Sequence, residues 1–287
     1  MKIHVYRRNL KSWAISPHIV AAIEGFKRHG LSPILKMPGA PEKCDLAVMW
    51  AFKKPRERES GRRALILERG YVGDRLGMWT SCGFDGLNGR ADFCNSNSPK
   101  WRWDRLCKIE GKHHVGGKLM QPWRTRGHDG DYVLIMGQVE GDASLANVNI
   151  NNWYRTIALR LRHAGLRSAF RAHPLSHNTP AIRGLNAISR DVRLDEAMHN
   201  AKWVVTYNSN SGVDSLLAGI PVVACDEGSM VYGLAGKNPI IPPPMLDRTQ
   251  WARDIAFAQW TIEEIRTGQM WDHLKAGMEL SDAAATA

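Results

Sequence analysis

The stretch TYNSNSGVDSLLAGIPVVACDEGS, residues 206–229, carries the clearest structural signal in the chain. It follows an apolar run, opens with small polar residues, continues as a helical pattern up to Gly219, and closes with a second apolar run. Strand, loop, helix and strand in this order predict parallel strands joined by a helical crossover. The polar loop before the helix has two interpretations: it caps the helix, or its backbone N–H groups bind an anion.

The same alternation of strand and helix is predicted in both halves of the chain. In the second half it gives strand 131–138, helix 152–164, strand 168–174, helix 194–199, strand 203–208, helix 212–219 and strand 220–226. In the first half it gives strand 1–6, helix 17–30 and strands 32–36, 44–51 and 63–70. Alternation of this kind implies parallel sheets. Residues 52–63 read as a charged helix or loop, and residues 70–130 as a long loop-rich region of the kind that is usually functional.

The fold class is therefore α/β, with two Rossmann-like domains expected to face a central cleft. We place the first domain at residues 1–126 and the second at 127–245. Residues 246–287 are predicted to form helices that pack back toward the first domain.

The charge of the chain is unevenly distributed along its length. Residues 1–130 hold 25 Lys and Arg against 12 Asp and Glu, a net +13, whereas the remaining residues hold 14 against 16, a net −2. Six of the eleven tryptophans also lie in residues 1–130, where KWRWDR (100–105) interleaves bases with rings. A one-sided basic surface favours a polyanionic partner such as DNA, although a solvated basic face and core aromatic rings remain the alternatives.

Several classes of protein and site are disfavoured. No apolar run is long enough to cross a bilayer, so no membrane partner is expected and we predict a cytoplasmic protein. The five cysteines include no C-x-x-C pair, and His113 and His114 lack a second set of ligands, so neither disulfides nor a metal site is expected. Motifs of the nicotinamide-binding and P-loop types are absent, and no permanently bound cofactor is predicted.

Polar residues follow three predicted strands of the second half. Because the carboxyl ends of parallel strands meet at one edge of a sheet, we expect these residues to lie together and to bind a phosphate-containing ligand. The candidates are Gln138, Asp142, Arg171, His173, Pro174, Asn208, Ser209, Asn210, Ser211 and Gly212.

The order of these motifs resembles the donor domain of GT-B glycosyltransferases, in particular the capsular Kdo-transferase and bacterial polysialyltransferase group. His173-Pro174 resemble that group's HP motif, Ser209 and Ser211 its serine motif, and GQVEGD (137–142) its glutamine–aspartate loop. The resemblance covers residues 131–235 and implies a nucleotide-sugar donor, with His173 stabilising the leaving phosphate. A UDP-sugar is the donor we expect first, with CMP- and GDP-sugars still open.

The first half does not visibly match that group, apart from Asp85-Gly86, which resemble its acid–glycine motif. We predict Asp85 as the catalytic base and Glu68, at the end of a predicted strand, as the second choice. Part of this region is similar to phage proteins, and the T-even phage DNA glucosyltransferases show that a GT-B enzyme can accept a hydroxymethylated base. A DNA surface is predicted at Arg56, Arg58, Arg62, Arg63, Lys100, Arg102 and Arg105.

Three functions are therefore open. The first is transfer of a sugar to a hydroxymethylated pyrimidine in DNA, which would occur in the host cytoplasm if the chain is phage-encoded. The second is transfer to a capsular or lipid-linked glycan, and the third is nucleic-acid binding by a non-catalytic GT-B shell. The sequence leaves the sugar, the anomeric outcome and the oligomeric state undetermined.

Overall fold

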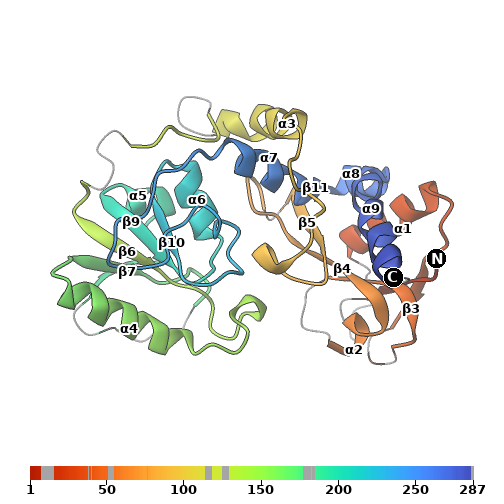
Figure 1. Ribbon diagram of the computed structural model, residues 1–287, viewed down its shortest axis with the longest axis horizontal. Coiled ribbons are helices and arrows are strands. Elements are labelled where there is room, and N and C mark those ends of the chain that lie inside the picture. The colour runs from red at the N-terminus through yellow and green to blue at the C-terminus, as the bar shows by residue number, and fades with distance from the viewer. Residues whose placement is uncertain are drawn as a thin grey trace. The chain divides into compact units, whose positions relative to one another are not determined.

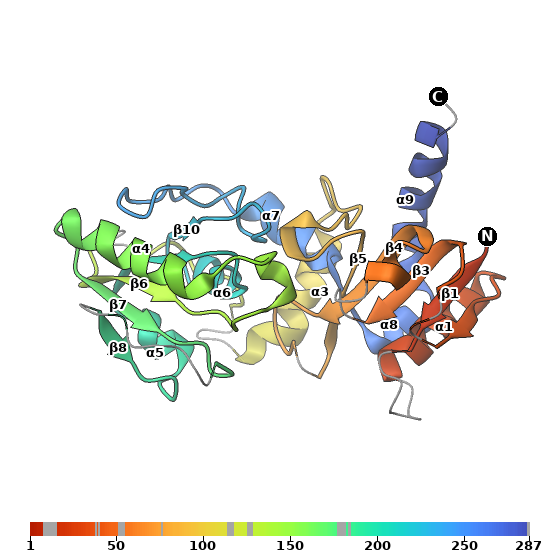
Figure 2. The same ribbon diagram turned by 90° about the horizontal axis from the view of Figure 1, so that it is seen from below.

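The structure is a computed structural model that describes residues 1–7, 16–37, 39, 41–50, 55–75, 77–113, 118–124, 129–176, 182 and 185–285. The chain divides into two compact units, each with its own sheet (Figures 1 and 2). The first unit comprises Met1–Glu110 and Thr249–Ala287, and the second comprises Gly111–Arg248. The domain boundaries predicted from the sequence, residues 1–126, 127–245 and 246–287, stay a prediction.

The first unit contains a six-stranded mixed sheet. Its strands are β1 (Ile3–Tyr6), β2 (Ile34–Lys36), β3 (Cys44–Trp50), β4 (Gly61–Arg69), β5 (Trp79–Phe84) and β11 (Gln259–Thr261), in the order β11-β5-β4-β3-β1-β2. Strands β1 to β4 pair with one another in parallel, as predicted. The sequence does not predict β5 and β11, which pair antiparallel with β4 and β5 respectively. The expected loop-rich region therefore contains a strand.

Helices from both the start and the end of the chain pack against this sheet. They are α1 (Pro17–Arg28), α2 (Pro55–Arg58), α3 (Trp101–Glu110), α7 (Thr249–Phe257), α8 (Ile262–Arg266) and α9 (Gln269–Ala285), with 3₁₀ turns at Asn88–Arg90 and Gly111–His113. The rings of Phe26 and Trp271 meet at 4.9 Å in a core that also contains Leu65 and Leu67. A side chain on Gly25 of α1 would come within 2.1 Å of the Ile265 carbonyl, so glycine allows α1 and α8 to pack closely.

A buried ion pair joins α3 to α8. Arg102, only 2% exposed, donates from Nη1 and Nη2 to the two carboxylate oxygens of Glu264 at 2.8 and 3.0 Å. Its guanidinium also lies 3.7 Å from the centre of the Trp260 ring. A buried charge is tolerated only when it is paired and hydrogen-bonded, and both conditions hold here.

The second unit contains a five-stranded sheet in which every neighbouring pair is parallel. Its strands are β6 (Tyr132–Met136), β7 (Ser168–Arg171), β8 (Asn186–Ile188), β9 (Ala201–Thr206) and β10 (Val222–Ala224), in the order β10-β9-β6-β7-β8. Its helices are α4 (Ile150–His163), α5 (Leu194–Met198) and α6 (Ser211–Leu217), with a 3₁₀ turn at Ala143–Leu145. The predicted parallel sheet is confirmed, apart from the short strand β8, which the sequence does not predict.

Because all five strands run in the same direction, their carboxyl ends lie at one edge of the second sheet. The loops that follow β6, β7, β9 and β10 leave from that edge, and they contain the donor-binding candidates. Close packing at the edge depends on Gly137, where a side chain would approach the backbone nitrogen of His173 to 2.7 Å.

Candidate functional site

Asn208 is the hub of a hydrogen-bonded network at the carboxyl edge of the second sheet. Its side-chain oxygen accepts from Gln138 Nε2 at 2.7 Å, and its backbone nitrogen donates to Gln138 Oε1 at 3.2 Å. Its Nδ2 donates to the Ser144 carbonyl and to Asp226 Oδ2, both at 2.7 Å. Asn208 is 2% exposed, so this network fixes the loops after β6, β9 and β10 relative to one another.

Gln138 and Asp142 hold the loop after β6 in place through internal hydrogen bonds. Gln138 is 7% exposed, and its backbone nitrogen donates to the Tyr154 hydroxyl at 2.6 Å. Asp142 Oδ1 accepts from both the backbone nitrogen and the hydroxyl of Ser144 at 2.8 Å, which caps the 3₁₀ turn. The structure therefore brings these candidates together with Asn208, and it occupies the Gln138 side chain with internal hydrogen bonds.

The loop from Ser209 to Gly212 forms a tight turn into α6. The Ser209 backbone nitrogen donates to the Thr206 hydroxyl at 2.9 Å, and the Ser211 nitrogen donates to the Ser209 hydroxyl at 3.3 Å. The Ser211 hydroxyl oxygen is buried, and no residue in the described part of the chain hydrogen-bonds to it. A buried hydroxyl without a partner is costly to the folded protein.

His173 lies at the end of β7 in a defined tautomer. Its Nδ1 accepts a hydrogen bond from the Leu175 backbone nitrogen at 3.1 Å, which requires a lone pair on Nδ1. The ring proton is therefore on Nε2, the nitrogen that can donate to an anion. The adjacent Pro174 is exposed and directs the chain away from the strand.

Arg171 has a structural role. Its guanidinium is buried and donates to the carbonyl of Val192 at 2.8 Å, in the loop that follows β8. Burial lowers the pKa of Arg171. Because its N–H groups hold this loop, Arg171 is separate from the network around Asn208.

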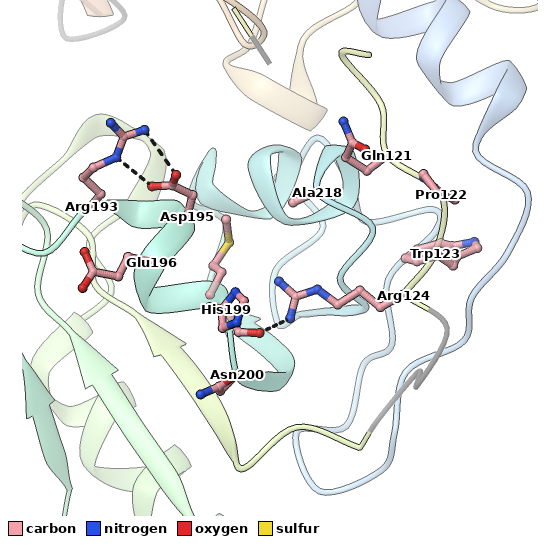
Figure 3. A pocket seen from close by; sticks show the side chains of 11 residues that line it. Gln121, Pro122, Trp123, Arg124, Arg193, Asp195, Glu196, His199, Asn200 and Ala218 are labelled. Atoms are coloured by element: carbon pink, nitrogen blue, oxygen red, sulfur yellow. Dashed lines mark hydrogen bonds and ion pairs between the residues drawn. The ribbon is translucent and has the colours of Figure 1, made fainter. Parts of the chain in front are cut away.

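A cavity of about 840 Å³ opens at the opposite edge of the second sheet. Its lining includes Trp123, Arg124, His199, Asn200 and Ala218. Figure 3 shows Arg124 directed at the carbonyl of His199, to which it donates a hydrogen bond. Asn200 immediately precedes β9, so the cavity lies at the amino ends of the strands, and it contains none of the sequence-predicted site residues.

In the first unit, the two candidate bases lie at opposite edges of the sheet. Asp85 follows β5, which is antiparallel to β4, so it lies beside the amino end of β4. Its two carboxylate oxygens accept from the Ala64 backbone nitrogen and from Arg63 Nε, both at 2.7 Å. Glu68 is half-buried near the carboxyl end of β4, where ligands of parallel sheets bind. Of the two predicted bases, Glu68 is therefore the one at the ligand-binding edge of the sheet.

The predicted DNA-contacting residues are not all on the surface. Arg102 lies inside the first unit and is held by Glu264, so it is not available to a phosphate. Arg63 is bound by Asp85 and Asp92, and Arg105 pairs with Glu264. Arg56, Arg62 and Lys100 are exposed, and Lys100 lies 3.3 Å from exposed Asp104. Arg58 is half-buried and lies 3.8 Å from Glu59.

Three polar residues of the two sheet edges are not predicted from the sequence. Asp226 anchors Asn208, and the available signal is its position at the end of a predicted strand. His18 and Thr80 meet at the carboxyl edge of the first sheet, 62 positions apart in the chain, which no local pattern reveals.

Among the described residues, no group of three or more His, Cys, Asp or Glu side chains is arranged to hold a metal ion. No helix in the described chain is long and apolar enough to span a membrane.

Comparisons with known proteins support the fold. No family model matches the chain, and no curated protein matches its sequence. The β-Kdo 2,7-transferase of Thermosulfurimonas dismutans KpsC superposes with a TM-score of 0.57 at 16% identity, over 96% of this chain and 100% of that one. The β-Kdo 2,4-transferase of the same organism's KpsC gives 0.54 at 15% identity, over 93% and 98% of the two chains. The chain therefore has a GT-B-like α/β fold built from two Rossmann-like units.

Proposed function

We propose that this protein is a glycosyltransferase that binds a nucleotide sugar at the carboxyl edge of the second sheet. His173 carries this proposal, since it follows β7 at the same edge as the network around Asn208 and its Nε2–H can donate to an anion. The Ser211 hydroxyl is enclosed at the start of α6, so it would donate to a phosphate oxygen of the donor after a local shift of this turn. His173, with its proton on Nε2, would donate to the charge that develops on the leaving phosphate.

The two KpsC enzymes are named as Kdo transferases, and this supports the reaction class at the level of fold only. In the proposal, residues 127–245 bind the donor and residues 1–126 bind the acceptor. A UDP-sugar is tested first, followed by GDP- and CMP-sugars. The proposed setting is the cytoplasm, where nucleotide sugars are available.

Two acceptors are proposed, each with its own support. The net charge of +13 on residues 1–130 favours a polyanion, and the first candidate is a hydroxymethylated pyrimidine in DNA. The likeness to Kdo transferases favours a glycan acceptor as the second candidate. The internal pairing of Arg63, Arg102 and Arg105 reduces the number of cations available to DNA, so the acceptor is decided by experiment.

The test incubates the protein with UDP-glucose, GDP-mannose or CMP-Kdo and with either 5-hydroxymethylcytosine DNA or a Kdo-terminated oligosaccharide. Released nucleotide is quantified, and the acceptors are analysed by mass spectrometry. We expect the mass of one sugar to be added to one acceptor. If no donor is consumed with any acceptor and none binds in calorimetry, the proposed function is wrong.

His173→Ala tests the donor site within the same assay. Loss of one donor to developing negative charge costs about 10²–10³ in rate. The matched control is His163→Ala, since His163 is exposed at the far end of α4 and faces no residue of the network. Equal rates for the two variants would contradict the role of His173.

A further inference from the structure

His18 lies at the carboxyl edge of the first sheet, where residues from three elements converge. It is in the first turn of α1, Trp50 ends β3, and Thr80 is the second residue of β5. Since β5 is antiparallel to β4, the first residues of β5 lie at the same edge as the last residues of β3 and β4. This is the edge at which parallel α/β sheets bind their ligands.

The His18 ring is held in one orientation. Its Nδ1 is 2.7 Å from the hydroxyl oxygen of Thr80, a residue with no exposed surface. The ring also packs against the Trp50 indole, with 4.5 Å between the centroids and a 40° tilt. These two contacts fix the ring plane, so the direction of Nε2 is fixed as well.

The Nε2 atom of His18 differs from that of a core histidine. His4, which is fully buried, has an Nε2 that is enclosed and lacks a hydrogen-bond partner among the described residues. His18 is half-buried, its Nε2 is not one of the enclosed atoms, and no described residue hydrogen-bonds to it. Among the described residues, Nε2 therefore has no assigned hydrogen bond that would keep it from an acceptor. Burial of the ring lowers the pKa of His18, which keeps the imidazole neutral near pH 7.

We propose that His18 is the catalytic base that takes the proton of the acceptor hydroxyl, an inference that rests on the proposed glycosyl transfer. In the tautomer whose Nδ1–H donates to the Thr80 hydroxyl, Nε2 has the lone pair. The acceptor oxygen forms a bond to the anomeric carbon while its proton passes to this lone pair. The bond from that carbon to the donor phosphate breaks, and the nucleotide leaves with the electron pair. The imidazolium then returns its proton to water, so the residue is unchanged after each turnover.

This assignment separates His18 from the other candidate at this edge. Leu67 belongs to the core cluster on the α1 side of the sheet, and successive side chains of a strand point to opposite faces. Glu68 therefore lies on the face away from α1, and the two groups do not form a pair. Their variants are consequently expected to behave independently.

The main experiment compares His18→Ala with a matched variant at the other end of the same helix. His29 follows α1, and its Nε2 hydrogen-bonds to the Gly268 carbonyl, so His29→Ala is the control for a lost histidine contact. We expect His18→Ala to lower the transfer rate by about 10²–10⁴-fold, the usual effect of a general base, with unchanged binding of the nucleotide sugar. Added imidazole should restore part of the rate to His18→Ala, which a purely structural role would not allow. His29→Ala should retain the wild-type rate.

A second variant tests whether His18→Ala merely misfolds, and a chemical probe tests whether the His18 ring is accessible. His18→Gln keeps a polar side chain at this position, and circular dichroism compares its fold with that of the wild type. Diethyl pyrocarbonate, which modifies accessible neutral imidazoles, should label His18 ahead of His4, as read by peptide mass spectrometry.

The outcomes separate the two proposals. If the wild type transfers sugar and both His18 variants transfer it at the wild-type rate, His18 is not the base and the proposed function stands. Protection of His18 from diethyl pyrocarbonate in the native fold would likewise overturn the assignment. If the wild type neither binds nor consumes any of the three nucleotide sugars, the proposed function fails and the role of His18 fails with it.

Discussion

Removing the Ser211 hydroxyl should stabilise the protein and weaken its binding of the nucleotide sugar at the same time. In Ser211→Ala the buried oxygen that has no partner among the described residues is replaced by hydrogen. An unsatisfied buried polar group costs about 1–3 kcal/mol, so its removal should stabilise the folded state. Ser211 is the first residue of α6, where the helix propensity of alanine adds little. We expect a gain of about 1 kcal/mol in unfolding free energy, or about 2–4 °C in Tm.

The same change should weaken donor binding, because a hydrogen bond to a charged phosphate contributes about 1.5–3 kcal/mol. That corresponds to roughly ten- to hundredfold in Kd for the nucleotide sugar. Differential scanning fluorimetry measures the first effect, and isothermal titration calorimetry measures the second. The opposite signs of the two effects distinguish a ligand-binding hydroxyl from a structural one.

Ser215→Ala is the matched control on the same helix. Its hydroxyl donates to the Ser211 carbonyl at 2.8 Å, so its removal should lower stability and leave donor affinity unchanged. If Ser211→Ala lowers the Tm, or binds the nucleotide sugar as tightly as the wild type, the reasoning from the buried hydroxyl is refuted.

Three further predictions concern the frame of the molecule. Arg102→Met leaves Glu264 buried without its main partner and should cost about 3–5 kcal/mol of stability in urea unfolding; a loss below 1 kcal/mol would contradict the role of this pair. Burial alone would raise the pKa of Glu264, but hydrogen bonds and charge from Arg102 lower it, so the pair stabilises the protein above the ordinary glutamate pKa. That stability should be lost as the pH falls through the lowered pKa, and urea midpoints between pH 7 and 3 should show a shallower decline for Glu264→Gln than for the wild type. Gly137→Ala forces a Cβ to within 2.7 Å of the His173 nitrogen and should reduce transfer more than Gly141→Ala, where nothing lies within 4 Å of the added atom, although that glycine has a φ of 69°; equal rates would exclude close packing at Gly137 as a requirement.

The second sheet could be predicted in large part because its signals are local. The stretch 206–229 gives the end of β9, α6 and β10 where they are expected, since a buried parallel strand is nearly continuous in apolar residues and a polar loop precedes the helix. The parallel direction of the strands then places the loops with Gln138, His173 and Asn208 at one edge. Which of these residues can bind a ligand depends on side-chain contacts. The Gln138 side chain, for example, is hydrogen-bonded to Asn208.

The first unit shows what local sequence cannot determine. Strand β5 contains Thr80, Ser81 and Gly83, so it has no clear apolar period, and it forms because β4 and β11 pair with its two sides. Arg102 lies in a basic, aromatic-rich segment that resembles a nucleic-acid contact. Its partner Glu264 is 162 positions away, and only the packing of α3 against the end of the chain brings them together.

The sequence by itself determined the α/β class, the parallel second sheet and the loops that carry the donor-binding candidates, because strand and helix periodicity is local and a helical crossover makes the strands that it joins parallel. Tertiary structure alone decided which polar groups are buried, paired or open. It placed Asp85 and Glu68 at opposite edges and set His18 against Thr80. The physical reason is that hydrogen bonding and burial depend on neighbours that are distant in the chain, and no periodicity records them.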